Sequence, residues 1–131
     1  MFTVTVQPHG KYPDYELPSE EQIKVELENI TDEEKNAQYQ YYTQQLYETD
    51  MFIGELIQRL SEYEEPVAVL FYGDHFPTIY LEDGCLTEGT KYQTDWVIWS
   101  NYNLKAENKD VMSYQLVSHF LKSLGSNLGM T

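Results

Sequence analysis

Two short polar clusters carry the residue types in this sequence that are best suited to chemistry. The first, Gln7–Gly10, contains a histidine, and the second, Gly73–His75, contains an adjacent aspartate and histidine. Asp74 and His75 offer one hard oxygen and one borderline nitrogen, a ligand pair that suits zinc, manganese or iron. Gly73 would let the backbone turn, so that both side chains could reach one ion. The second cluster is therefore a candidate metal site.

Each candidate residue also has a purely structural interpretation. Asp74 could begin a turn, with His75 packing or hydrogen-bonding nearby, and His9 could close the end of a strand. His119 lies inside a predicted helix, and we interpret it as structural. Cys85 has no nearby base in the sequence, so we assign it no catalytic role.

The elements that must position these clusters follow from hydrophobic periodicity. An apolar stripe at three- and four-residue steps predicts one long helix, which begins after an N-cap at Thr31, with Glu34 in the capping-box position, and reaches about Glu62. Its solvated face is assigned the residues Gln38, Gln40, Gln44, Gln45, Glu48, Glu55 and Gln58. The other predicted elements are strands at Phe2–Val6, Val67–Tyr72 and Thr94–Ser100, a helix at Asp110–Leu124, and an irregular stretch Lys11–Ile30 with a short strand at Ile23–Leu27.

The order of these elements is strand, long helix, strand, strand, helix. A strand, a crossover helix and a strand favour an α/β layered sheet, in which ligands bind outside the carboxyl ends of the strands. Both polar clusters follow such strands. The helix would be ~45 Å long, whereas a compact domain of this size has a radius of gyration near ~14 Å. We therefore expect either a break near Asn36 or Gly54, or a chain that is a fragment of a larger domain.

Composition excludes several classes of protein. The chain has 131 residues, the size of one domain, with 8 Lys+Arg against 22 Asp+Glu and a net charge of −14. Such a charge repels phosphate backbones, so nucleic acid is not an expected partner. The one cysteine excludes an intramolecular disulfide. We identify no apolar run of about 20 residues and no signal-peptide pattern, so the chain itself is expected to be soluble and to carry no targeting signal.

Three segments together carry a family resemblance: FTVTVQPHGKYP, YYTQQLYETDMFIGELIQRLSEYEEPVAVLFYGDHFPTI, and TDWVIWSN with the closing amphipathic helix. They resemble the C-terminal part of the lipoteichoic acid synthase and phosphoglycerol transferase branch of the sulfatase/alkaline-phosphatase superfamily. The resemblance covers nearly the whole chain and is weakest at Tyr12–Ile30. It implies that residues 1–131 are the C-terminal part of a sulfatase-like catalytic domain. The implied fold is α/β, the C-terminal portion of an alkaline-phosphatase-like layered sheet with a long crossover helix, in the order β-α-β-β-α.

The same resemblance implies roles for individual residues. Asp74 and His75 would bind a single divalent ion, commonly manganese, with zinc, magnesium or calcium as alternatives. His9 would contact the phosphate of the substrate. The family's threonine nucleophile and glutamate metal ligand lie upstream of anything that matches here. Thr3, Thr5 and Thr31 are present, but none of the three has a matching nucleophile context. We therefore expect no catalytic nucleophile in this fragment.

The implied parent is a phosphoglycerol or phosphoryl transferase, or a sulfatase-like hydrolase, that forms a phospho-threonine intermediate. Its substrates would be phospholipid head groups or polymer phosphodiesters of the cell envelope. The family's polytopic anchor would hold the extracytoplasmic catalytic domain at the cell membrane, and the isolated fragment would be inactive. The alternative from a different class is a non-catalytic, acidic, tyrosine-rich binding or interaction module.

Overall fold

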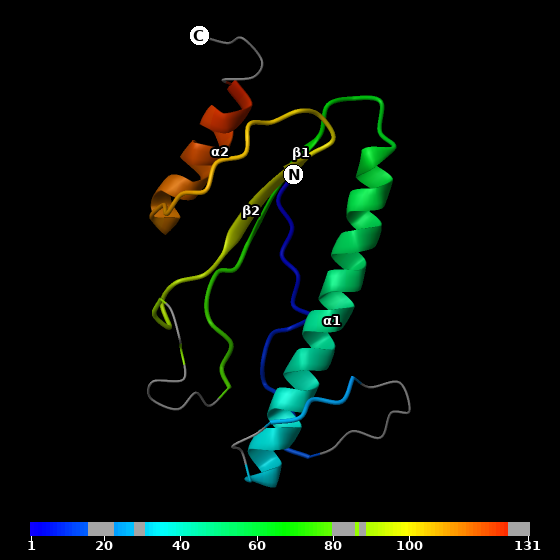
Figure 1. Cartoon of the computed structure of the whole chain (residues 1–131), viewed down its shortest axis with the longest axis vertical. Coiled ribbons are helices and arrows are strands. Elements are labelled where there is room, and N and C mark those ends of the chain that lie inside the picture. Colours follow the sequence, from blue (N-terminus) through cyan, green and yellow to red (C-terminus); the bar gives the residue numbers. More distant parts are fainter. Residues whose placement is uncertain (16–22, 28–30, 80–85, 87–88, 126–131) are drawn as a thin grey trace. The chain divides into compact units, whose positions relative to one another are not determined.

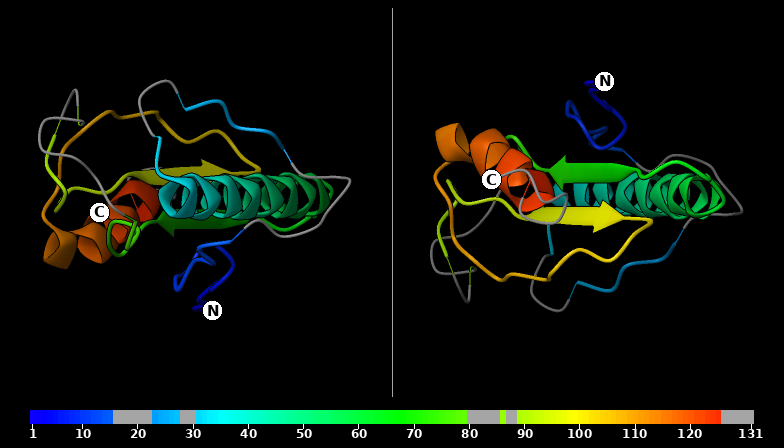
Figure 2. Two further views of the ribbon diagram at one scale, coloured as in Figure 1. Left: turned by 90° about the horizontal axis from the view of Figure 1, so that it is seen from below. Right: turned by 90° about the horizontal axis from the view of Figure 1, so that it is seen from above.

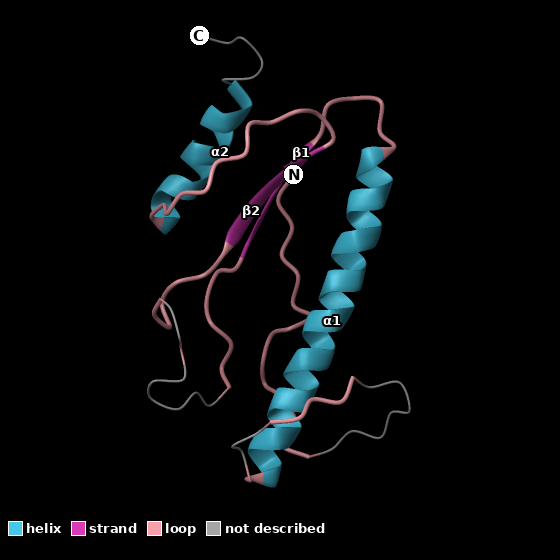
Figure 3. Cartoon of the chain, viewed as in Figure 1, coloured by secondary structure: helices cyan, strands magenta, loops and turns pink. Residues whose placement is uncertain are grey.

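The computed structural model describes residues 1–15, 23–27, 31–79, 86 and 89–125. Its elements are α1 (Glu33–Ser61), β1 (Ala68–Tyr72), β2 (Trp96–Ser100), the 3-10 helix η1 (Ser113–Gln115) and α2 (Leu116–Gly125) (Figures 1 and 3). The chain forms two units. Unit 1 comprises Met1–Leu56 and His75–Gln93, and unit 2 comprises Ile57–Asp74 and Thr94–Thr131. Cys85, to which the sequence analysis assigned no catalytic role, lies outside the described residues.

The long helix is confirmed as a single element of 29 residues. It begins one residue later than predicted, because Asp32 is the N-cap: its Oδ1 accepts a hydrogen bond from the Lys35 amide at 3.1 Å. The predicted cap, Thr31, stands one position too early to reach that amide. The helix runs unbroken through Asn36 and Gly54, so the first of the two sequence expectations, a break, is wrong.

The segment that precedes α1 contains no strand among its described residues. The short strand predicted at Ile23–Leu27 is absent, because its backbone bonds to side chains instead of to another strand. The amide of Ile23 donates to Gln44 Oε1 at 2.9 Å, and the amide of Val25 donates to Gln40 Oε1 at 2.8 Å. Glutamine side chains of α1 thus satisfy donors that a sheet would otherwise pair.

The sheet lies in unit 2 and has two antiparallel strands, with Leu70 opposite Ile98 at its centre. The two arrows point in opposite directions in Figure 2. Phe2–Val6, the first predicted strand, is exposed loop (Figure 3), so the predicted order β-α-β-β-α is not formed by these residues. β1 is half-buried rather than buried on both faces, since a two-stranded sheet cannot cover both faces of so apolar a run. The structure is a small α/β arrangement.

Asn101, directly after β2, ties several parts of unit 2 together. Its Oδ1 accepts a hydrogen bond from the Val67 amide at 2.8 Å. Its Nδ2 faces three backbone carbonyls, those of Leu60 at 3.3 Å, Tyr63 at 3.1 Å and Glu65 at 3.0 Å. One side chain therefore closes the end of α1 and fixes the entry to β1.

The closing helix is shorter than predicted. Its α-helical part begins at Leu116 after the η1 turn, instead of at Asp110. His119 of α2 packs edge-on against Trp96, with ring centroids 5.2 Å apart, and its Nε2 lies 3.9 Å from a carboxylate oxygen of Glu107. This packing agrees with a structural role for His119. None of the helices in the described part of the chain is long and apolar enough to cross a membrane.

Candidate active site

The second polar cluster begins where β1 ends, and a close backbone approach shapes it. The Gly73 amide donates to Asp95 O at 3.2 Å, and Thr94 Oγ1 donates to Gly73 O at 2.7 Å. A Cβ at Gly73 would lie 3.3 Å from Thr94 Cβ, which is tighter than ordinary contact. Glycine therefore lets the two strand ends meet at this point, and Asp74, the next residue, is exposed.

The ring of His75 is held in a defined state by its own backbone neighbour. Its Nδ1 lies 2.8 Å from the carbonyl oxygen of Phe76. A carbonyl can only accept, so Nδ1 carries the hydrogen and the lone pair of the neutral ring is on Nε2. Metal-binding histidines typically donate their other ring N–H to a carbonyl or carboxylate in this way. The geometry therefore suits ligation through Nε2.

His9 has the same local arrangement in the first polar cluster. Its Nδ1 lies 2.6 Å from Gly10 O, and its backbone amide donates to Val6 O at 3.1 Å. The first contact again places the hydrogen on Nδ1, and the second makes His9 the last residue of a tight turn. His9 thus presents Nε2 from an exposed loop whose backbone is hydrogen-bonded.

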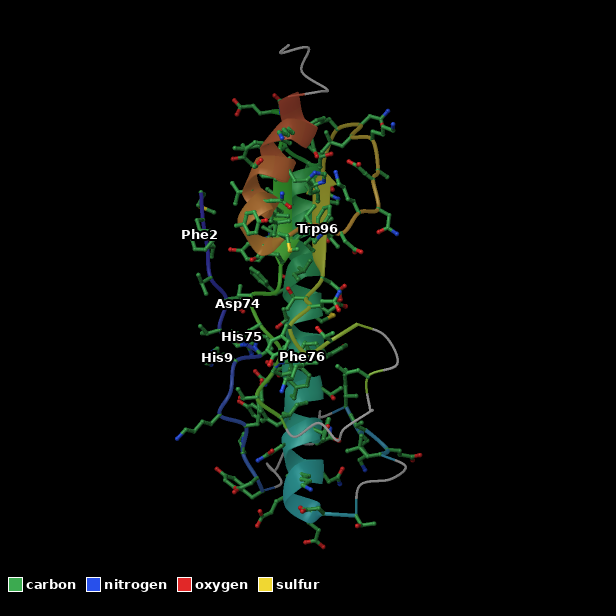
Figure 4. All side chains as sticks on the ribbon, turned by 90° about the vertical axis from the view of Figure 1, so that its left-hand side faces the viewer. Phe2, His9, Asp74, His75, Phe76 and Trp96 are labelled. Atoms are coloured by element: carbon green, nitrogen blue, oxygen red, sulfur yellow. The ribbon has the colours of Figure 1, made fainter. Side chains whose placement is uncertain are left out.

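The structure brings His9 and His75 together within unit 1. Their ring centroids are 5.7 Å apart, with the planes at 81°, and Figure 4 shows the two rings beside each other. The two segments approach closely next to this pair, since a Cβ at Gly10 would lie only 2.5 Å from Thr78 Oγ1. Asp74 belongs to unit 2 and His75 to unit 1. The roles of these residues stay predictions.

A buried tyrosine supports the loop that carries His9. Tyr12 is 8% exposed, and its hydroxyl donates to Pro8 O at 2.7 Å. Its ring packs against Tyr42 and Tyr41 of α1, with centroid distances of 5.4 and 6.4 Å. Burial raises the pKa of Tyr12 above 10.0, and the nearby Tyr42 raises it further; burial also raises the pKa of Tyr42. These tyrosines therefore act as packing groups.

Sequence reasoning missed a second support for the same loop. Gln7 Nε2 donates to Gln45 Oε1 at 2.8 Å and to Glu48 Oε2 at 2.6 Å. Gln45 had been assigned to the solvated face of the helix, yet it is only 8% exposed. The periodicity of apolar residues places every glutamine side chain of the helix in solvent. In the structure, glutamine side chains of α1 instead face another segment of the chain. The regular spacing of Gln40, Gln44 and Glu48 was the signal that could have indicated this.

The metal proposed from the sequence can be tested against the donor atoms present. A carboxylate oxygen and an imidazole nitrogen fit a divalent ion, and the hydrogen bond at Nδ1 of His75 orients the nitrogen for it. Within the described residues, however, no group of three or more His, Cys, Asp or Glu could hold a metal. Among the described residues, the proposed site therefore has two ligands, which is half of the four that a structural zinc site uses.

Comparison with known proteins identifies the family of this chain. A family model described as Sulfatase matches residues 1–126. No curated protein and no solved structure gave a match. The matched range contains both polar clusters and nearly the whole chain, and the chain therefore belongs to the sulfatase family.

Proposed function

We propose that this chain contributes part of a divalent-metal site for phosphoryl or sulfuryl transfer, as the C-terminal part of a sulfatase-family catalytic domain. The observation that carries the proposal is the pairing of His9 and His75, whose rings lie 5.7 Å apart with each Nδ1 bonded to the next carbonyl. Two imidazoles held in this way suit two roles, one as a ligand of a metal ion and one as a hydrogen-bond contact to an anionic substrate. Membership of the sulfatase family supports this class of reaction.

In this proposal Asp74 and His75 hold the ion, through a carboxylate oxygen and through Nε2. Manganese is the ion that the sequence resemblance favours, and zinc, magnesium and calcium are alternatives. When bound, the ion supplies Lewis-acid stabilisation of negative charge on a phosphoryl or sulfuryl oxygen. The nucleophile would be a threonine in a part of the enzyme that precedes this chain, together with a glutamate ligand.

His9 would act on the substrate and not on the ion. With Nδ1–H engaged by Gly10 O, a proton gained by the ring resides on Nε2. That N–H can donate to a phosphoryl oxygen as charge develops on it. One preorganised donor of this kind typically contributes roughly 3–4 kcal/mol to the transition state.

The finer assignment rests on the sequence resemblance. We propose a phosphoglycerol transferase of the lipoteichoic acid synthase type, acting on a phospholipid head group or a polymer phosphodiester. Its catalytic domain would be extracytoplasmic and anchored in the cell membrane, and its complete layered sheet would have the order β-α-β-β-α, with Phe2–Val6 as a strand. The alternation of exposed apolar side chains in that segment supports the last point. The alternative, a tyrosine-rich binding module, has less support because Tyr41 and Tyr42 pack against Tyr12.

The two histidine roles can be separated in the complete enzyme. His75→Ala should lower metal content and turnover of a phosphodiester together, and excess manganese should restore part of both. His9→Ala should leave the ion bound and lower turnover by ~10²–10³-fold, because it removes only a donor to the transferring group. The third histidine provides a control, since His119→Gln should change neither quantity by a comparable amount.

Metal analysis decides between the possible outcomes. If His9→Ala removes the metal as fully as His75→Ala does, His9 is a ligand and the assignment is wrong. If neither substitution changes turnover, both clusters are structural and the proposal fails.

A further inference from the structure

We propose that Gln7 is a positioning residue for His9, and that it acts through Gln45 and Glu48 of α1. The catalytic consequence of this inference rests on the function proposed above, whereas the positioning itself does not. The three side chains all lie in unit 1, and nothing in the family match assigns them a role.

The hydrogen bonds of Gln7 use both hydrogens of one nitrogen. Nε2 donates to Gln45 Oε1 at 2.8 Å and to Glu48 Oε2 at 2.6 Å. The acceptors are themselves fixed. Gln45 is buried in the helix, and the second carboxylate oxygen of Glu48 accepts from Gln44 Nε2 at 3.0 Å. The Gln7 amide therefore meets a receptor in which one acceptor is held by burial and the other by a second hydrogen bond.

The position of Gln7 in the backbone turn connects this receptor to His9. The His9 amide donates to Val6 O, so Gln7 and Pro8 are the two central residues of a turn that ends at His9. Pro8 has a fixed φ, which leaves that turn few alternative shapes. Holding the Gln7 side chain against α1 therefore sets the direction in which His9 leaves the turn.

A second attachment follows three residues after His9. Tyr12 packs on Tyr42 of α1, and its hydroxyl returns to Pro8 O. His9 thus lies between two points at which the loop is fixed to the same helix, and Gly10 contacts Thr78 on the segment that carries His75. If the Gln7 attachment is lost, only one end of the loop stays fixed. A displacement of about 1 Å in a catalytic group can lower a rate by ~10²-fold.

Exchanging the neutral and the charged side chain between Gln7 and Glu48 tests the hydrogen bond that joins them. Gln7→Glu places a carboxylate beside that of Glu48, where the present contact is 2.6 Å, so the two should repel. Glu48→Gln alone keeps an acceptor. With both substitutions, the new amide at position 48 can donate to the new carboxylate at position 7, and Gln45 can turn its amide to donate as well. Gln7 and Glu48 line a cavity of about 470 Å³, so these substitutions of equal size meet no crowding.

The first measurement is kinetic and uses the complete enzyme with a phosphodiester. We expect Gln7→Glu to lower kcat/KM by about 10–100-fold with metal content unchanged, and the double variant to recover most of the loss. Gln58→Glu, on an exposed part of α1, is the matched control for added charge and should have little effect.

The second measurement is spectroscopic and does not require activity. In the 131-residue chain with ¹⁵N-labelled histidine, recorded at alkaline pH, His9 should show the Nδ1–H tautomer that its contact with Gly10 O requires. Gln7→Glu should shift His9 toward a mixture of tautomers, and the double variant should restore the original state. His119 serves as the internal reference for the fold.

The outcomes separate this inference from the proposed function. If the wild-type enzyme turns over no phosphate or sulfate ester but the His9 tautomer follows the exchange, the function is wrong and the positioning is right. If Gln7→Glu changes neither rate nor tautomer, the positioning is wrong whatever the reaction is. If Gln7→Glu fails to fold, Gln7→Met removes both hydrogen bonds without adding charge. Wild-type values for Gln7→Met, or loss of folding in it as well, would also overturn the inference.

Discussion

Replacing Asn101 tests the most connected polar side chain in unit 2. Its Nδ2 has two hydrogens facing three carbonyls and its Oδ1 accepts one amide, so about three hydrogen bonds can form at once. Each contributes on the order of 1 kcal/mol net, and the site is half-buried. Asn101→Ala should therefore lower the free energy of unfolding by about 2–3 kcal/mol.

Asn101→Asp should be more harmful than alanine at neutral pH. The substitution keeps the shape and the Oδ1 acceptor, but it places a second carboxylate oxygen against the carbonyls of Leu60, Tyr63 and Glu65. Because the charged form is disfavoured in the folded state, the pKa of the new carboxyl should lie above its unfolded value of about 3.9. Stability relative to wild type should thus recover as the pH falls toward 4 and decline as the pH rises.

Urea denaturation of the 131-residue chain measures both effects. With a slope of about 1–3 kcal/mol per molar urea, the alanine variant should lower the midpoint by roughly 1–2 M. Asn103 is exposed and lies two residues away, so Asn103→Ala and Asn103→Asp are matched controls. The reasoning fails if Asn101→Asp is as stable as Asn103→Asp at pH 7, because the three carbonyls would then not face the substituted oxygen.

The elements that the sequence predicted correctly are those with a local signal. Three- and four-residue spacing of apolar side chains identified α1, and the apolar runs identified β1 and β2 within two residues of their observed starts. Phe2–Val6 has an equally clear alternating pattern but is exposed loop. A strand needs a partner for its backbone groups, and no local pattern shows whether one is present. Alternation therefore predicts the side-chain environment of a strand and not its pairing.

The candidate site was also predictable only in part. Residue types selected His9, Asp74 and His75, and the structure places His9 beside His75. The support beneath them was not predictable, because it consists of long-range hydrogen bonds such as that of Gln7 to Glu48, which are 41 residues apart. Hydrophobic periodicity has no means of finding a polar contact between segments. Glutamines on a helix face are therefore worth testing as supports before they are assigned to solvent.

Three further predictions address the loop, the tyrosines and the ion. Gly10→Ala puts a methyl group 2.5 Å from Thr78 Oγ1, so it should reduce turnover of the complete enzyme about 10-fold or more. Adding Thr78→Ala should restore part of the loss. If Gly10→Ala alone leaves turnover unchanged, the contact is not rigid. Because burial raises the pKa of Tyr12 and Tyr42, the folded state holds these protons more tightly than the unfolded state. Stability should thus be constant up to about pH 10 and fall above it, and Tyr12→Phe should weaken that fall in alkaline unfolding curves. Finally, the isolated chain should bind manganese or zinc weakly, since the described residues supply no set of three or more ligands and a two-ligand site leaves most coordination positions to water. Calorimetry that found submicromolar affinity, abolished by Asp74→Asn, would mean that this chain holds further ligands for the same ion, and the glutamate proposed to lie upstream would no longer be needed to complete the site.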